Sequence, residues 1–263
     1  MSGFTTFAAA ADDKDQPVDL GNITVHASPF GRAADDLTQP VDVLAGTQLE
    51  RKRKTTIGET LEGELGVATS DFGPGVGRPI IRGQAGPRVQ VLENGIGSMD
   101  LSSASDDHAV TIDPADAQQV EIIKGPATLI YGSGASGGVV NVVNNRLAEK
   151  YDDGLHARVD ASYADNGNDR NSSANVDYGL AGTMIHLDGA ERRALGDFKI
   201  PGNTQPDGGG TQGYIPNSAV RTQSVGVGAT NLGDWGSVGM AASLYNNRYG
   251  VPGEVGTTKY LDM

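Results

Sequence analysis

The sequence predicts an α+β domain in the first part of the chain, followed by the beginning of an antiparallel transmembrane β-barrel of about five strands. Three observations point to this fold class. Glycine supplies 38 of 263 residues, and hydrophobic residues at 37% with aromatic residues at 5% make a thin core for a soluble protein of this length. Strict alternation of apolar and polar residues begins after about Ala148. The connections between the alternating segments are short at one end and longer at the other, as in outer-membrane barrels.

Composition also excludes several classes of protein. The 20 basic and 33 acidic side chains give a formal net charge of −13, which leaves no excess of cations to replace counterions along a nucleic acid. No run of apolar residues is long enough to predict a membrane-spanning helix. The chain contains no cysteine, so disulfide scaffolds, thiolate zinc sites and cysteine nucleophiles are excluded.

The N-terminal residues predict a processing signal or linker rather than a folded element. Residues 7–11, a phenylalanine and four alanines, precede an acidic stretch and resemble the small-residue end of a secretory signal. An ordinary frayed terminus explains them equally well. Residues 12–40 are polar and contain three prolines, with one short extended patch at 23–27.

Signals for regular structure begin at Val41. Thr56 and Glu59 form a capping box ahead of a short helix predicted over 57–65. The run of glycines between 73 and 77 predicts a loop. Strands are predicted over 88–92, 120–122 and 139–143. Asn94-Gly95 predicts a tight hairpin turn after the first of these strands, because both residues tolerate positive φ.

The second part of the chain consists of segments with a period of two. Their apolar sets span 155–163, 174–180, 185–187, 225–229 and 238–244. Small or charged residues occupy the positions between them, which is typical of a transmembrane β-barrel. A water-soluble sheet with one exposed face gives the same pattern, and the connections favour the barrel. They are medium at 164–171, short at 179–182, long at 195–219 and short at 231–236.

Six stretches in the first part of the chain occur in the order and spacing of one known domain. They are Thr56–Leu61, Ile80–Gly83, Arg88–Gly95, Ile112–Pro114, Val120–Pro126 and Leu129–Asn141. Together they resemble the plug domain of TonB-dependent outer-membrane receptors. Upstream, five residues resemble the TonB box, the extended segment that pairs with TonB: Ile23, Thr24, Val25, His26 and Ala27. One departure from the family pattern is Gln119, where members often carry arginine.

The resemblance implies four segments. These are a signal-peptide remnant or linker at 1–16, the TonB-box region and linker at 17–40, the plug domain at 41–147, and the N-terminal part of the β-barrel at 148–263. The implied function is not enzymatic: it is energised uptake of a scarce nutrient across the outer membrane of a Gram-negative cell, with the plug facing the periplasm. The implied partners of a monomeric receptor are the TonB complex of the inner membrane, outer-membrane lipid, and a metal ion such as zinc or a ferric siderophore. No intrinsic cofactor and no nucleic acid are implied.

The resemblance also assigns charged plug residues to contacts with the barrel. These residues are Arg82, Arg88, Glu121 and Lys124. A polar barrel interior suits them, because a buried charge without a partner costs several kcal/mol.

The sharpest ligand candidate is the run Asp106, Asp107 and His108. Two carboxylates and an imidazole can supply ligands to zinc or another divalent ion. The run lies in a polar loop between Gly95 and Asp113 and resembles the corresponding loop of zinc-uptake receptors in the family. A solvated polar loop explains the same residues, and the outer loop introduced by Tyr249 lacks the histidines typical of those receptors.

Two other motifs have a structural explanation. Residues 132–137 satisfy the dinucleotide fingerprint G-x-G-x-x-G, but that site needs a helix after the glycines. The following Val139–Val143 is β-branched and predicts a strand. The basic run at 51–54 predicts a solvated helix surface rather than a contact site.

Five strands are too few to close a barrel of this class, which has 22 strands. Five strands leave two open edges, which hydrocarbon does not tolerate. The chain is therefore expected to be a fragment of a longer product or a truncated pseudogene. The alternative is a soluble, plug-like periplasmic binding module without transport activity. A true stop after Met263 favours the module, and in-frame continuation into further alternating strands favours the receptor.

Overall fold

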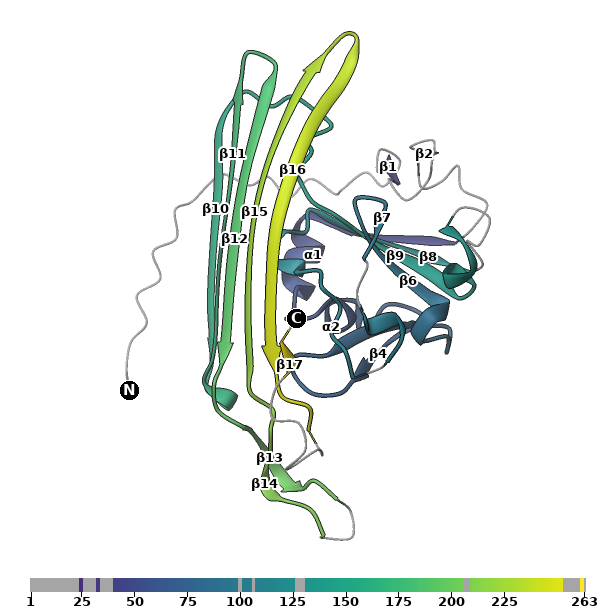
Figure 1. Cartoon of the computed structure of the whole chain (residues 1–263), viewed down its shortest axis with the longest axis vertical. Coiled ribbons are helices and arrows are strands. Elements are labelled where there is room, and N and C mark those ends of the chain that lie inside the picture. The colour runs from purple at the N-terminus through teal and green to yellow at the C-terminus, as the bar shows by residue number, and fades with distance from the viewer. Residues whose placement is uncertain are drawn as a thin grey trace.

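The computed structural model describes residues 24–25, 32–33, 40–98, 101–105, 107–125, 131–205, 209–252 and 261–262. Five long strands stand side by side as a tall, curved sheet, and a mixed α/β domain packs against one face of it (Figure 1). We call the tall sheet the wall. The wall rises above the mixed domain at its upper end, and the hairpin of residues 198–215 extends below both (Figure 1).

The mixed domain is built on a five-stranded sheet in the order β3-β8-β9-β6-β7. Its strands are β3 (Val41–Ala45), β6 (Val89–Glu93), β7 (Ile96–Gly97), β8 (Gln119–Lys124) and β9 (Gly138–Val143). The pair β6–β9 is parallel and the other pairs are antiparallel. Asn94 and Gly95 adopt φ of 48° and 80° in the turn from β6 to β7, so the predicted hairpin is confirmed.

Two helices and a hairpin cover this sheet. They are α1 (Gly46–Lys52), α2 (Ile57–Leu61), β4 (Val67–Asp71) and β5 (Gly77–Ile81). The hairpin β4–β5 flanks the loop predicted from the glycine run. Aliphatic side chains from the helices and strands form the core, among them Leu44, Ile57, Leu61, Ile81, Val120, Ile122 and Val140.

The helix α2 begins as predicted and ends earlier. Thr56 accepts a hydrogen bond from the backbone N–H of Glu59, and Glu59 accepts one from the backbone N–H of Thr56, which completes the capping box. The helix stops at Leu61, so its predicted extension to residue 65 is wrong. Gly63 has a φ of 91°, which a helix does not allow, and Leu65 is therefore 86% exposed instead of buried.

Short elements connect these parts. A two-stranded sheet pairs β1 (Thr24–Val25) with β2 (Arg32–Ala33). The 3-10 turns are η3 (Gly86–Arg88), η4 (Leu101–Ser103), η5 (Pro114–Asp116), η6 (Ser133–Ala135) and η7 (Asn166–Asn168). The glycine run at 132–137 leads into strand β9 rather than a helix, as predicted.

The wall has the strand order β10-β11-β12-β15-β16-β17, and every pair is antiparallel. Its strands are β10 (Gly154–Ala164), β11 (Asp169–Leu180), β12 (Thr183–Ala194), β15 (Val220–Gly233), β16 (Gly236–Tyr249) and β17 (Leu261–Asp262). The five long strands contain the five predicted apolar sets. Residues 195–219, predicted as a loop, include a hairpin of β13 (Phe198–Asn203) and β14 (Gln212–Ile215).

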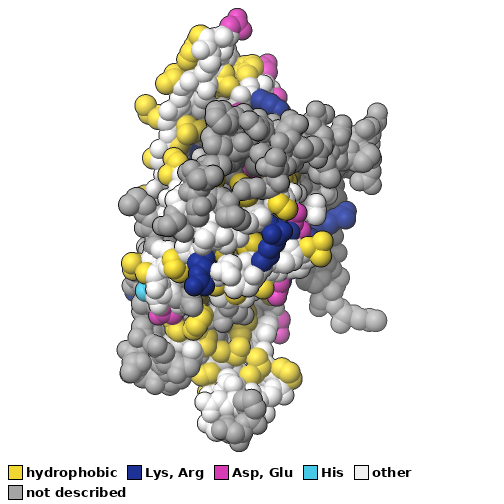
Figure 2. Space-filling model, turned by 90° about the vertical axis from the view of Figure 1, so that its right-hand side faces the viewer, with side chains coloured by type: hydrophobic (Ala, Val, Ile, Leu, Met, Phe, Trp, Pro, Cys, Tyr) yellow, Lys and Arg dark blue, Asp and Glu magenta, His cyan; other side chains and the backbone are white. Residues whose placement is uncertain are grey.

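Alternation divides the wall into two chemically different faces. Polar side chains such as Asn175, Asp188 and Ser224 point to the mixed domain and bond with it. The opposite face exposes Leu155, Val159, Tyr178, Ile185, Leu187, Val225, Val227, Met240 and Leu244. Seen from the mixed domain, hydrophobic side chains gather on the strands that project above it (Figure 2). No helix in the described part of the chain is long and apolar enough to cross a bilayer.

Candidate functional site

A buried network of charged side chains joins the mixed domain to the wall. Its centre is Arg146, which lies between β9 and β10 and is 8% exposed. Its Nε and Nη2 donate to the two oxygens of Asp188 on β12 at 2.7 and 2.9 Å. Its Nη1 donates to Glu93 on β6 at 2.7 Å. Residues 144–153, between β9 and β10, form a linker that contains Arg146. One guanidinium therefore connects the domain sheet, this linker and the wall.

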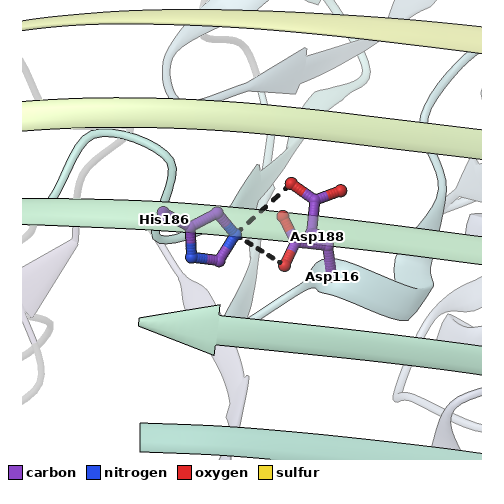
Figure 3. A group of neighbouring side chains, drawn as sticks. All are labelled: Asp116, His186 and Asp188. Carbon is purple, nitrogen blue, oxygen red and sulfur yellow. Dashed lines mark ion pairs between the residues drawn. The ribbon is translucent and has the colours of Figure 1, made fainter. Parts of the chain in front are cut away.

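The network continues through His186, which is next to Asp188 on the same face of β12. The Nε2 of His186 lies 3.3 Å from an oxygen of Asp116 in η5 and 3.3 Å from an oxygen of Asp188 (Figure 3). Its Nδ1 is 2.8 Å from Asp177 on β11. Asn175 of β11 also donates to Asp116. The side chains of His186 and Asp188 are both 2% exposed, so these contacts are shielded from water.

Three members of the network have the donor set of a metal site. One ligand atom each from Asp116, His186 and Asp188 lies within 4.8 Å of the others. However, Arg146 already occupies both oxygens of Asp188, and its Nε is 3.6 Å from Asp116. A fixed guanidinium beside the carboxylates repels a second cation. The group is therefore an ion-pair network rather than a metal centre.

Burial shifts the pKa values of the domain residues in this network. Burial raises the pKa of Asp116, and it also raises the pKa of Glu93 despite the neighbouring guanidinium. For Arg146, burial alone would lower the pKa, but hydrogen bonds with Asp188 and the charge of Glu93 outweigh it and raise the pKa. Arg146 is therefore a permanent cation in a buried acidic environment.

Two glycines on the inner face of β15 make room for this linker. A Cβ at Gly228 would lie 1.7 Å from the carbonyl oxygen of Arg146. A Cβ at Gly226 would lie 2.2 Å from both the Nε of Arg146 and an oxygen of Asp188. The alternation on β15 thus places its smallest residues where the linker approaches the wall.

Further contacts between the domain and the wall lie away from this network. Arg158 on β10 donates to the carbonyl of Ala115 at 3.1 Å, and Ser224 on β15 donates to Asp113 at 2.7 Å. Arg192 on β12 pairs with Asp169 and donates to the carbonyl of Pro74 at 2.8 Å. A cavity of about 310 Å³ separates the end of α1 from the inner face of the wall. These contacts between the two parts are polar and separated from one another.

A second junction holds the loop that contains the predicted metal ligands. The fully buried Tyr249, at the end of β16, accepts a hydrogen bond from the backbone N–H of Ala109 at 3.0 Å. Its hydroxyl donates to the carbonyl of Asp107 at 3.2 Å. Around it pack Val76 of the domain and Val220 and Val251 of the wall side.

The predicted ligand run is described in part. Asp106 lies outside the described residues. Ser105 donates to the side chain of Asp107, and this hydrogen bond lowers the pKa of that carboxyl. The Nδ1 of His108 is buried and has no hydrogen-bond partner in the described part of the chain. Binding of a metal by this run stays a prediction.

Two of the four predicted plug–barrel contact residues, Glu121 and Lys124, make their bonds inside the domain. Glu121 is buried and accepts hydrogen bonds from Gln119 at 2.7 Å and Asn141 at 3.0 Å. Lys124 pairs with Asp42 and donates to the carbonyl of Leu65 at 2.6 Å. Arg82 and Arg88 are exposed. A role for these four residues against a barrel stays a prediction.

The residues of the TonB-box resemblance lie at the edge of the described chain. Thr24 and Val25 form strand β1, so the extended conformation expected of this patch is present in its centre. Ile23, His26 and Ala27 lie outside the described residues. Residues 1–16, with the signal-like stretch, lie outside them as well.

Sequence reasoning missed Asp116, Arg146, His186 and Asp188 as members of one network. The period of two marks His186 and Asp188 as inward-facing, because apolar Ile185 and Leu187 alternate with them. No local pattern indicates which domain residues they meet, since Asp116 and Arg146 are distant in sequence.

Comparison with known proteins agrees with this architecture. Residues 33–139 match a family model described as TonB-dependent Receptor Plug Domain. The copper transporter OprC superposes with a TM-score of 0.66 at 20% identity, covering 81% of this chain and 31% of that one. The siderophore receptor PirA from Acinetobacter baumannii gives 0.63 at 19% identity, covering 87% and 34%. The ferric yersiniabactin uptake receptor FyuA from Yersinia pestis gives 0.59 at 17% identity, covering 82% and 33%.

The chain therefore spans about a third of the length of the receptors it matches. Residues 33–139 match the model of the TonB-dependent receptor plug domain, and the described residues have the fold of the part of TonB-dependent receptors that runs from the plug into the first strands of the barrel.

Proposed function

We propose that this protein acts as a TonB-dependent receptor of the Gram-negative outer membrane, and that it takes up a scarce metal ion or a ferric siderophore. The observation that carries the proposal is the buried network around Arg146, which holds a plug domain against the polar face of strands whose other face is apolar. A soluble module would expose that contiguous apolar face to water, which soluble monomers avoid.

The proposed arrangement gives each segment a task. Residues 17–40 carry the TonB box, residues 41–147 are the plug facing the periplasm, and residues 148–263 begin the barrel. TonB adds a strand to the box by main-chain hydrogen bonds and pulls on the plug. The short strand β1 already has the extended backbone that strand addition requires.

A proline in the box tests the partner. Because strand addition uses backbone donors, Val25→Pro should abolish binding of the purified C-terminal domain of TonB, while Val25→Thr should preserve it. Binding is measured by calorimetry on the protein in neutral detergent. Leu37→Pro, within residues 17–40 but outside the box, serves as the control and should bind normally. Normal TonB binding by Val25→Pro would contradict the assignment of the box.

The ligand class rests on the loop that Tyr249 holds. The structural neighbours include a copper transporter and siderophore receptors, so both metals and chelates occur among receptors of this fold. Asp106, Asp107 and His108 offer two carboxylates and an imidazole to a divalent ion. The buried Nδ1 of His108, without a described hydrogen-bond partner, supports a ligand role.

Calorimetric titration with zinc tests this loop. The protein should bind one zinc ion, and His108→Ala should weaken binding at least about tenfold, because outer-shell and ligand losses typically cost that much. The exposed His156 on β10 provides a matched control, and His156→Ala should bind zinc normally. Equal zinc affinity of the wild-type protein and His108→Ala would contradict the metal site and favour a ferric siderophore as the ligand.

A further inference from the structure

One row of the wall carries four arginines in direct register on four neighbouring strands. Arg170 of β11 is opposite Arg193 of β12, Arg193 is opposite Arg221 of β15, and Arg221 is opposite Arg248 of β16. Tyr163 of β10 extends the row on the other side of Arg170. All four arginines are exposed. We call these four residues the arginine row.

The arginine row lies on the apolar face of the wall, away from the plug. The sequence neighbours of three of its members face the plug. Asp169 and Arg192, next to Arg170 and Arg193, pair with each other on the inner face, and Tyr249, next to Arg248, is buried against the plug loop. Side chains on one strand alternate between faces, so Arg170, Arg193 and Arg248 point outward. An outward arginine is tolerated in a barrel only near the membrane interface, because at mid-bilayer it costs about 2–4 kcal/mol.

The rows that precede it change step by step from apolar to polar. Three successive outward rows are Leu155-Tyr178-Ile185-Ala229-Met240, Ala157-Val176-Leu187-Val227-Ala242 and Val159-Ala174-Gly189-Val225-Leu244. The next row is Ala161-Ser172-Glu191-Gln223-Asn246, and the arginine row follows. Rows are spaced by two residues, or about 7 Å along the strand. The arginines therefore lie where the strands leave the hydrocarbon and enter the headgroup layer.

The position of the long connection identifies the side of the membrane. The arginine row is at the strand ends that carry residues 195–219 with the hairpin β13–β14, whereas the short turns at 181–182 and 234–235 close the other end. Outer-membrane barrels have short periplasmic turns and longer extracellular loops. On this basis the arginine row faces the outer leaflet.

The row is electrostatically unbalanced. Like charges directly opposite on neighbouring strands destabilise a sheet, and adjacent strands are only about 5 Å apart. Glu191 lies 2.6 Å from Arg193 and 3.6 Å from Arg221, so one carboxylate offsets part of the charge of two arginines. Arg170 lies over the ring of Tyr163 at 6.0 Å. On the other side of the row, Asp262 of β17 is opposite Arg248 in the strand register. Four arginines thus stand against two acidic residues, Glu191 and Asp262, and the patch keeps an excess of positive charge in a protein whose formal net charge is −13.

We infer that the arginine row binds the phosphate groups of a phosphorylated glycolipid in the outer leaflet. Guanidinium groups bind phosphate through paired N–H donors, and two arginines on adjacent strands can share one phosphate between them. The acyl chains of the same lipid then cover the three apolar rows, and Tyr163 lies at the headgroup level, where barrels place aromatic residues. This inference rests on the proposed location in the outer membrane and is independent of TonB.

Lipid binding in neutral detergent tests the inference directly. Bisphosphorylated lipid A, the same lipid with both phosphates removed, and inorganic phosphate as competitor are the probes, and native mass spectrometry counts the bound lipid. Arg193→Gln with Arg221→Gln should weaken binding of bisphosphorylated lipid A about 30-fold. Arg193→Lys with Arg221→Lys keeps the charge but removes the paired N–H donors, so its binding should lie between those of the wild-type protein and the glutamine variant. Arg51→Gln with Lys150→Gln removes equal charge elsewhere and should bind as the wild type does.

The outcomes separate the inference from its alternatives. Equal binding of the phosphorylated and dephosphorylated lipids by the wild-type protein would overturn it, as would an equal loss in the Arg51→Gln, Lys150→Gln control. Complete displacement of the lipid by millimolar inorganic phosphate would show a free-anion site instead of a lipid site. The proposed transport can fail in the TonB assay while lipid binding persists, so the two proposals are tested separately.

Discussion

At the scale of single residues, Arg146 connects three acidic side chains across the described interface, those of Asp188, Glu93 and Asp116. It donates hydrogen bonds to both carboxylate oxygens of Asp188 and to one oxygen of Glu93. Asp188 is on the wall and Glu93 is on the domain sheet, so Arg146 connects the two. Removing one member of a buried ion pair leaves the other charged and without compensation. Loss of this guanidinium should therefore destabilise the joined plug and wall more than loss of a partly exposed contact such as Arg158.

Replacing Arg146 by methionine should lower the free energy of unfolding by about 3–5 kcal/mol, since Asp188 and Glu93 lose their cation. The double variant Arg146→Met, Asp188→Leu should recover part of that loss, because it removes the uncompensated charge as well. Urea unfolding of the detergent-solubilised protein measures both. Arg158→Met, whose side chain is 29% exposed, is the control and should cost about 1 kcal/mol or less. A double variant less stable than the single one would contradict the ion-pair explanation.

At the scale of the element, the alternation of side chains along strand β15 places its residues in three different environments. Val225 and Val227 face outward in the apolar rows, Gln223 and Arg221 face outward at the polar end, and the glycines between them face the linker. The capping box of α2 works at the same scale: two residues three apart define where a helix starts, whatever it packs against.

Arginine substitutions along β15 should follow the depth of each row. Val227→Arg, in the middle apolar row, should destabilise the protein in a bilayer by about 2–4 kcal/mol, and Gln223→Arg by about 1 kcal/mol or less. Both side chains lie on the same face of the same strand, so they differ chiefly in depth. Equilibrium unfolding from lipid vesicles measures the difference. Equal costs at the two positions would argue against a lipid-facing surface.

At the scale of the whole molecule, Tyr249 couples the end of the last long strand to the plug loop more than a hundred residues earlier. Its hydroxyl bonds to the backbone of both Asp107 and Ala109. The loop with the predicted metal ligands is thereby held by the wall as well as by the plug. In the proposed receptor, a ligand bound at this loop would be in contact with both the plug and the wall.

Tyr249→Phe should free this loop without emptying the apolar cluster around the ring. The backbone N–H of Ala109 loses its acceptor, and an unsatisfied buried donor costs about 1–3 kcal/mol. Hydrogen exchange should therefore accelerate at Ala109 and leave the amides of β8 and β9 protected. Tyr163→Phe, on the outer face, is the control and should leave Ala109 unchanged. Unaltered exchange at Ala109 in Tyr249→Phe would show that the loop is held by other contacts.

Local pattern determined most of the architecture of this protein. The capping box of α2, the Asn94-Gly95 turn, the plug strands β6, β8 and β9 and the five alternating sets of the wall depend on neighbours in sequence, and each was predictable from them. The strands β3, β4 and β5 were not predicted. The end of α2 was not, because Gly63 interrupted an apolar spacing that otherwise continued to Leu65. The hairpin in residues 195–219 was missed because its strands are short and contain glycine and proline.

Tertiary structure alone decided which charges meet. His186 and Asp188 are inward by alternation, but their partners Asp116 and Arg146 reach them only because the plug packs against this part of the wall. The arginine row shows the same limit: four arginines scattered from position 170 to 248 become neighbours through strand register. A period of two in the sequence determines the face on which a side chain lies. Pairing between strands, whose energy comes from backbone bonds and burial summed over the sheet, determines what lies beside it.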